Sequence, residues 1–226
     1  MANSCSYWAT VCCWPPWPRC SHSLLALVLG YGKRVNNNGL IRITARIAAM
    51  GYAIPGTVIA IGVLIPFAWL DGQLNALSQH WFGVNVGLLF GGTLFTLLFA
   101  YNVRFLSVSL QTVEAGLGKI KPTLDDAGRS LGLNALGVLQ RLHLPLMKGS
   151  LLTALLLVFV DVLKELPATL ILRPFNFNTL AVRAYEMASD ERLADAGLPS
   201  IMIVAAGIVP VILLSRSITR SRAGSH

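Results

Sequence analysis

The sequence predicts an all-α polytopic membrane protein, a helical bundle of about four full spans preceded by a truncated one. Of the 226 residues, 54% are hydrophobic and only 12% are charged, whereas charged residues make up roughly 25% of an ordinary soluble domain. The apolar residues also gather in runs close to the length of about 20 residues that a helix needs to cross a bilayer. These observations exclude a disordered chain and argue against a soluble enzyme.

The first 22 residues differ in composition from the rest of the chain. They hold all four cysteines and three of the five tryptophans. The cysteine spacings match no paired zinc pattern, and the segment lacks the basic start and apolar core of a secretory signal. We therefore expect residues 1–22 to be an atypical leader, disordered or not native to the fold, in preference to a metal or disulfide cluster. Residues 23–222 would then form the transmembrane domain, and residues 223–226 a tail.

The apolar runs define the expected spans. Residues 23–32 form a run of ten, which we interpret as the end of a helix whose beginning is missing. Pro55 and Pro66 should kink or break the first full span. The third full span is interrupted by Asp161, Lys164, Glu165 and Pro167. The four full spans are residues 48–70, 84–103, 150–172 and 198–214.

The basic residues predict the orientation. Thirteen of the 18 lysines and arginines fall in residues 33–47, 104–149 and 215–226. The positive-inside rule places these three segments in the cytoplasm, and residues 71–83 and 164–197 on the opposite side. The C-terminus would thus be cytoplasmic. Because this distribution accounts for the net charge of +8, no nucleic-acid partner is needed.

Residues 104–149 contain signals for two short helices. Thr123 could cap the first, with Asp126 three residues later able to reach back, and Gly132 could end it. Asn134 could cap a second helix over residues 135–144. A compact pair of helices at the membrane surface suits docking to a partner, and an ordinary amphipathic interfacial helix is the equal alternative.

The run Asp126-Ala127-Gly128, followed by Gly132 and by Leu142-His143-Leu144-Pro145, resembles the EAA loop of type I ABC-importer permeases. The pattern of that loop is E-A-A, three residues, G, nine residues, I-x-L-P. The spacing is kept throughout, and the glycine and the final L-P are identical. The resemblance implies the type I ABC-importer permease fold for residues 23–222, with an EAA-like loop at residues 104–149 that contacts a cytoplasmic ATPase subunit. The implied contact residues are Asp126, Ala127, Gly128, Gly132, Leu142, Leu144 and Pro145.

A second stretch, from Glu165 to Phe175 and from Tyr185 to Arg192, is similar to the C-terminal half of bacterial ferric-iron permeases. The resemblance implies a multi-pass permease subunit of an ATP-driven importer for ferric iron in the bacterial inner membrane. Its partners would be the ATPase, a periplasmic substrate-binding protein, a second permease half or copy, and lipid. A permease for thiamine, a phosphonate or a polyamine, and a non-transporting remnant or scaffold of a permease, are the alternatives.

The chain is not expected to be an enzyme or to hold a cofactor or metal. The GK pairs of the sequence lack the rest of a Walker A pattern, so ATP hydrolysis would belong to the partner. Asp161, Lys164 and Glu165 are spaced to share one helix face within an apolar run. Such residues usually face a bundle interior or a water-filled path, so we interpret them as lining the translocation path. The alternative is that Pro167 ends the helix early and the group lies at the membrane interface.

Overall fold

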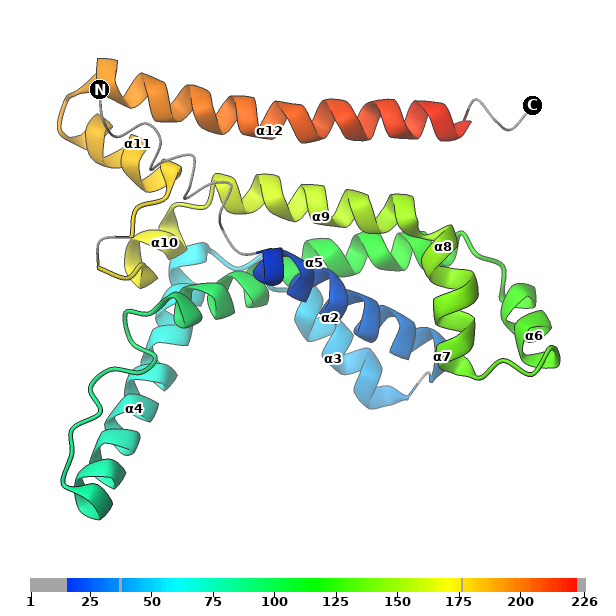
Figure 1. Cartoon of the computed structure of the whole chain (residues 1–226), viewed down its shortest axis with the longest axis horizontal. Helices are drawn as coiled ribbons and strands as arrows, with labels where there is room; N and C mark the ends of the chain where they lie inside the picture. Colours follow the sequence, from blue (N-terminus) through cyan, green and yellow to red (C-terminus); the bar gives the residue numbers. More distant parts are fainter. Residues whose placement is uncertain (1–15, 37, 176, 223–226) are drawn as a thin grey trace. The chain divides into compact units, whose positions relative to one another are not determined.

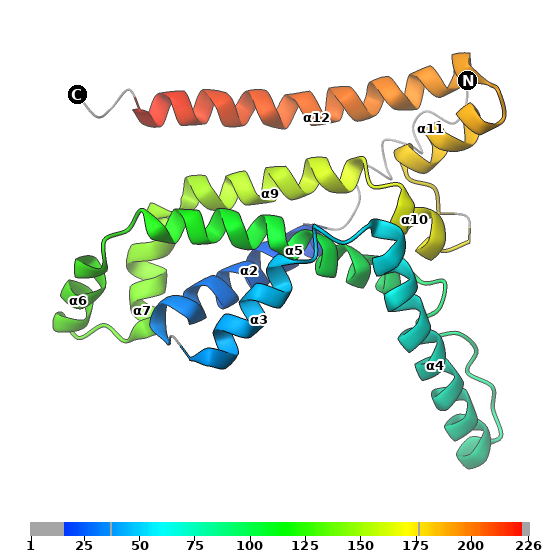
Figure 2. The same ribbon diagram turned by 180° about the vertical axis from the view of Figure 1, so that it is seen from behind.

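A computed structural model describes residues 16–36, 38–175 and 177–222, and these residues contain helices and connecting segments but no β-strands (Figure 1). Figure 2 shows the same helices from behind. In chain order the helices are α2 (Pro16–Val35), α3 (Gly39–Ala49), α4 (Gly56–Phe82), α5 (Leu94–Gly118), α6 (Pro122–Ser130), α7 (Ala135–Val138), the π-helix η1 (Leu139–His143), α8 (Leu144–Leu146), α9 (Lys148–Leu163), α10 (Pro167–Leu172), α11 (Leu180–Ser189) and α12 (Leu193–Arg222).

The described chain divides into two compact units. The first unit contains Ala53–Arg104 and Val162–Ala205, and therefore α4, α10, α11 and the first half of α5. The second unit contains Pro16–Tyr52, Phe105–Asp161 and residues 206–222.

Among the described residues, three helices are long and apolar enough to cross a membrane: Gly56–Phe82, Leu94–Gly118 and Leu193–Ile212. A fourth span is possible if Ala135–Leu146 and Lys148–Leu163, which meet at an angle of 74°, are one broken span. The predicted all-α membrane fold is confirmed. α2 does not meet the criteria for a span.

The start of α4 differs from the expected span because of a proline. The sequence predicts helix from residue 48, but Pro55 is the N-cap of α4, which begins at Gly56. Proline lacks a backbone N–H and fits a regular helix without distortion only in the first turn. Pro66 is an exception, because it lies inside α4. The helix then continues through Asp71, where we expected a loop, and ends at Gly83 with φ +66°.

α5 is also displaced from its expected span. It begins at Leu94 and runs to Gly118, so Arg104, which was expected to open the cytoplasmic loop, lies within the helix. The preceding residues 84–93 are not helical. Gly87 and Gly92 have φ values of +76° and +69°, a region that glycine adopts without the steric penalty of other residues.

The apolar run 150–172 is two helices. α9 ends at Leu163 and α10 begins at Pro167. The ring of a proline clashes with the carbonyl four residues earlier in a continuing helix, and that carbonyl belongs to Leu163. The expectation that Asp161, Lys164 and Glu165 share one helix face is therefore wrong, because only Asp161 lies in α9.

A helix overlaps the end of the expected leader. α2 begins at Pro16, so residues 16–22 are helical. Pro16 and Pro18 lie in its first turn, where a missing N–H costs no helical hydrogen bond. The remaining leader residues, with Cys5, Cys12 and Cys13, and the tail 223–226 lie outside the described residues.

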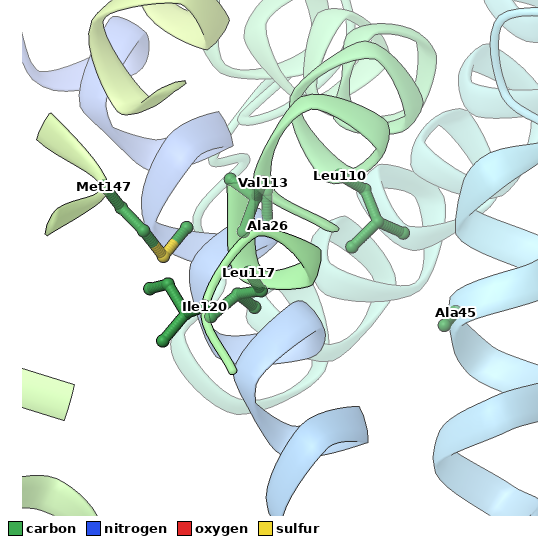
Figure 3. Packing of buried hydrophobic residues seen from close by; sticks show 7 residues of the cluster. All are labelled: Ala26, Ala45, Leu110, Val113, Leu117, Ile120 and Met147. Atoms are coloured by element: carbon green, nitrogen blue, oxygen red, sulfur yellow. The ribbon is translucent and has the colours of Figure 1, made fainter. Parts of the chain in front are cut away.

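The core of the second unit packs α5 against its neighbours. Figure 3 shows Val113, Leu117, Ile120 and Met147 gathered near Ala26 of α2. Two glycines allow the helices to approach closely. A Cβ at Gly116 would lie 2.7 Å from Cβ of Ser150 in α9, and one at Gly30 would lie 3.2 Å from Val113.

Candidate functional site

The candidate site lies in the second unit, between α5 and α9. Because α5 takes up residues 104–118 of the predicted EAA-like loop, the remaining structure is an elbow of residues 119–147, formed by α6 and by the consecutive helices α7, η1 and α8. The elbow contains every residue that the resemblance assigned to ATPase contact.

α6 begins two residues earlier than expected. Lys121 is the N-cap and Pro122 the first helical residue, and no side chain caps this end. The prediction of Thr123 as N-cap is wrong because Pro122 has a backbone angle preset for the first helical position and needs no hydrogen-bond acceptor.

Gly132 ends α6 as predicted. Its φ is +82°, its N–H donates to Arg129 O at 2.9 Å, and the N–H of Leu133 donates to Gly128 O at 3.1 Å. This pair of bonds is a Schellman motif, in which glycine adopts the left-handed conformation. The turn at Gly132 reverses the chain into the second arm of the elbow.

Asn134 caps the second arm, also as predicted, because its Oδ1 accepts the N–H of Gly137 at 2.8 Å. The arm continues past the expected end at residue 144 to Leu146. Its middle is the π-helix η1, which ends at His143, two residues before Pro145. A wider turn there accommodates a proline, whose ring would otherwise clash with the carbonyl of Arg141.

The two arms pack closely through Gly128. A Cβ at this position would lie 3.0 Å from Leu142 Cδ1 and 3.1 Å from Val138 Cγ2. The position therefore accepts only a very small residue, and the Gly128–Leu142 contact faces the inside of the elbow. Leu144 is half-buried.

The outer surface carries the other assigned residues: Asp126, Ala127, Gly132 and Pro145 are all exposed. Four leucines that were not among the assigned contact residues are exposed beside them, with Leu131 84% exposed. An unpartnered leucine at a helix–helix turn is the signal that could have identified Leu131. The four are Leu124, Leu131, Leu136 and Leu146.

Arg34, in the last turn of α2, binds the base of the elbow. Its guanidinium donates to Leu117 O at 2.5 Å and to Ile120 O at 2.9 Å, and its Nε donates to Asp125 Oδ2 at 2.8 Å. A cation that satisfies carbonyls at a helix C-terminus also interacts favourably with the helix dipole. Arg34 thus joins α2, the end of α5 and α6.

Asp125 connects this contact to the second arm. Its Oδ1 lies 2.6 Å from His143 Nε2, and the His143 side chain is fully buried. Burial would raise the pKa of Asp125, but hydrogen bonds and charges from Arg34 and His143 outweigh it, so the pKa lies below its usual value of 3.8. The carboxylate therefore stays charged and bridges both arms.

Tyr31, one turn before Arg34, completes the cluster. Its hydroxyl donates to Ala135 O at 2.6 Å, and its ring meets the His143 ring edge-on at 5.3 Å. The residues that the sequence predicted for the site did not include Tyr31, Arg34, Asp125 or His143. Tyr31 and Arg34 of α2 meet the elbow across separations of 104 and 91 residues, so no local spacing could have revealed the cluster.

The charged residues assigned to the translocation path differ in burial. Lys164 is exposed and Asp161 is half-buried, whereas Glu165 is 5% exposed in the first unit. Glu165 Oε2 lies 3.3 Å from Nε of Arg104, and its Oε1 accepts the N–H of Ala168 at 3.2 Å. The pair leaves no room beside it, since a Cβ at Gly56 would lie 2.5 Å from Arg104 and 2.7 Å from Glu165.

The chain is similar in sequence to two kinds of bacterial permease. The Fe(3+)-transport system permease protein FbpB 2 of Haemophilus influenzae is 31% identical over 147 residues, which are 65% of this chain and 29% of that protein. A second relative is the 2-aminoethylphosphonate transport system permease protein PhnV of Salmonella typhimurium, whose name is provisional. It is 26% identical over 164 residues, which are 73% of this chain and 56% of that protein. The chain thus spans less than two thirds of either relative. No protein-family model matches it.

Solved structures of ABC transporters share the fold. A bacterial transporter involved in alginate import matches with a TM-score of 0.64 at 17% identity over 93% of this chain and 73% of that chain. The MetNI methionine transporter matches with a TM-score of 0.55 at 14% identity over 88% of this chain and 93% of that chain. The resemblance that the sequence suggested is therefore confirmed: the chain has the all-α fold of ABC-importer permeases and is similar in sequence to permease proteins of bacterial iron and phosphonate transport systems.

Proposed function

We propose that the chain is a permease subunit of an ATP-driven importer in the bacterial inner membrane, and that the elbow docks to a separate cytoplasmic ATPase. The observation that carries this proposal is the division of the elbow into two faces. Its inner face is held by Arg34, Asp125 and His143, while Leu131 and Asp126 are exposed at the outer face. An elbow that is fixed on its inner face and exposes a leucine at the turn between its arms suits a docking contact.

The contacts of Arg34 supply a route for coupling. Because Arg34 bonds Asp125 of α6, the Leu117 carbonyl of α5 and the Ile120 carbonyl just beyond α5, a displacement of α6 would pull on the end of a candidate span. Coupling between sites travels through such hydrogen-bonded and packed elements. ATP hydrolysis itself belongs to the partner, and a periplasmic binding protein and a second permease half complete the importer.

The proposed substrate is ferric iron, on the basis of similarity to FbpB 2. A phosphonate is the second candidate, because PhnV aligns with a larger share of this chain. Thiamine, polyamines, and a remnant that does not transport are further alternatives. Uptake of radiolabelled ferric iron and of 2-aminoethylphosphonate by cells that express the chain with its partners distinguishes these cases. Asp161→Asn and Glu165→Gln in the same assay test whether either residue belongs to the translocation path.

The docking proposal is tested by co-purification with a candidate ABC ATPase. Leu131→Asp should abolish co-purification, because it places a charge at the exposed tip of the elbow. The matched control is Leu193→Asp, which changes another exposed leucine (71% exposed) at the start of α12 and should leave co-purification unchanged. Equal recovery of the ATPase by both variants would contradict docking at the elbow.

A further inference from the structure

In the first unit, the non-helical residues 84–93 fold back along the second half of α4. Figures 1 and 2 show this segment beside α4 in both views. Three polar side chains of α4, Asp71, Asn75 and Ser78, hold it in place. Their spacings of four and three residues put them on one helix face. We call residues 69–93 the α4 hairpin.

Asp71 binds the far end of the returning segment through three consecutive backbone N–H groups. Its Oδ1 accepts from Leu89 and Phe90 at 3.0 Å each, and its Oδ2 accepts from Phe90 at 3.2 Å and from Gly91 at 2.6 Å. A Cβ at Gly91 would lie only 3.2 Å from Oδ2. Asp71 is 2% exposed, so this carboxylate binds backbone N–H groups and does not face a solvent path.

Asn75 and Ser78 hold the middle and the beginning of the segment. Asn75 Oδ1 accepts the N–H groups of Val86 at 2.9 Å and Gly87 at 3.2 Å, and the Ser78 hydroxyl donates to Val84 O at 2.9 Å. Together with Asp71, these side chains satisfy five backbone donors of a non-helical segment without water.

The side chains on the outside of the hairpin are largely apolar. No Asp, Glu, Lys or Arg occurs between residues 72 and 103. The exposed large hydrophobic side chains of the hairpin are Trp69, Leu70, Leu77, Trp81, Phe82, Val84, Val86, Leu88 and Leu89. Soluble surfaces rarely expose so large an apolar patch.

We propose that the α4 hairpin is embedded in membrane lipid, where the sequence alone predicted an aqueous loop at residues 71–83. Hydrocarbon requires that backbone polar groups find partners within the protein, and Asp71, Asn75 and Ser78 meet that requirement for five donors. Tryptophan favours the membrane–water boundary, which suits Trp81 near the tip. The partner of this surface is therefore the acyl chains and headgroups of the lipid.

The length of α4 indicates the depth of each part. At 1.5 Å per residue, its 27 residues extend about 40 Å, whereas the hydrocarbon core is about 30 Å thick. If the core covers the first 20 residues of α4, Leu88, held between the levels of Asn75 and Asp71, lies at the edge of the hydrocarbon. Trp81 then lies about 9 Å farther out, among the headgroups.

Tryptophan fluorescence in proteoliposomes of the full chain tests the proposal. Each variant has a single tryptophan. It is Trp69 or Trp81, with the other four native tryptophans replaced by phenylalanine, or Leu88→Trp, with all five replaced. Lipids brominated on the acyl chains should quench Leu88→Trp as strongly as Trp69 on the wall of α4, and Trp81 less. Aqueous acrylamide should quench Leu88→Trp at most weakly. A Leu131→Trp variant, on the exposed elbow, is the control for aqueous quenching.

Two results would overturn the proposal. Strong quenching of Leu88→Trp by acrylamide would make the hairpin aqueous, and quenching by neither reagent would mean that protein, such as a second copy, covers it. Neither result bears on docking of the elbow, which lies in the other unit.

Asp71→Asn tests the role of the polar side chains. Asparagine keeps one acceptor oxygen, so two of the four bonds are lost, and amide hydrogen exchange at residues 89–91 should accelerate by about tenfold or more. The control is Asp190→Asn, an exposed acidic residue outside the hairpin, which should leave that exchange unchanged. Equal exchange at residues 89–91 in Asp71→Asn and wild type would contradict the role given to Asp71.

Discussion

At the scale of single residues, Arg34 links α2 to the end of α5 and to the elbow. It satisfies the Leu117 carbonyl in α5, the Ile120 carbonyl just beyond α5 and the carboxylate of Asp125. Lys33, its neighbour, makes a more exposed ion pair with Glu114 at 2.9 Å. The two residues therefore form a natural pair for comparison, with equal charge and different burial.

Arg34→Met should lower the free energy of unfolding by about 2–3 kcal/mol, because it leaves a partly buried carboxylate and two carbonyls without their donor. Lys33→Met should cost less than about 1 kcal/mol, as exposed ion pairs do. Denaturant unfolding of both variants in detergent measures the difference. Equal losses would mean that Arg34 acts as a surface charge only.

The lowered pKa of Asp125 predicts a specific acid sensitivity. A carboxyl whose pKa is lower in the folded than in the unfolded state adds stability above its unfolded value, and that stability is lost as the pH falls through the folded pKa. The stability of the wild type should therefore decline as the pH drops below about 4, the usual pKa of aspartate. Asp125→Asn should lack this part of the decline, while Asp126→Asn at the exposed neighbouring position should keep it. Identical pH profiles for all three proteins would refute the assignment.

At the scale of helices, the departures from the expected spans have two physical causes. Prolines set boundaries that a count of apolar residues does not detect, as at Pro55 and Pro167. Charged residues were taken to end spans, but Asp71 and Arg104 lie within helices because distant partners satisfy them: the backbone of residues 89–91 and Glu165. Local signals at Gly132 and Asn134 were interpreted correctly because their partners are within five residues.

Gly56 tests the helix packing around the Arg104–Glu165 pair. Gly56→Ala should lower the free energy of unfolding by about 1–3 kcal/mol, because the added methyl group forces the two paired side chains apart. Gly62→Ala lies in the same helix with no atom near its Cβ, and should be neutral or stabilising by up to about 1 kcal/mol. Thermal unfolding of the two variants measures this difference. Wild-type stability of Gly56→Ala would show that the Arg104–Glu165 pair tolerates displacement.

At the scale of the whole molecule, composition and hydropathy were enough to predict an all-α membrane bundle, and the spacing of the EAA-like residues was enough to predict its permease fold. The cluster of Tyr31, Arg34, Asp125 and His143 was not predictable, because it depends on how α2 packs against the elbow. The orientation in the membrane stays a prediction from the basic residues.

That orientation predicts opposite labelling of two exposed positions. In a chain whose four cysteines are replaced by serine, Gln140→Cys in the elbow should resist an impermeant thiol reagent added to intact spheroplasts. Ser189→Cys at the end of α11 should react, because residues 164–197 are expected on the other side. Both positions are exposed, so burial cannot explain a difference. Labelling of Gln140→Cys from outside would reverse the topology.

The central claim, that the elbow is the docking element of a permease, is tested most directly at Gly132. Its φ of +82° makes a β-branched residue cost about 1–2 kcal/mol in backbone strain, which disturbs the turn between the two arms. We predict that Gly132→Val inserts normally but binds a partner ABC ATPase about fivefold to thirtyfold more weakly than wild type. Gly149→Val, at a helical position with open space, should bind like wild type. Wild-type affinity of Gly132→Val for an ATPase that the unmodified chain binds would contradict the claim.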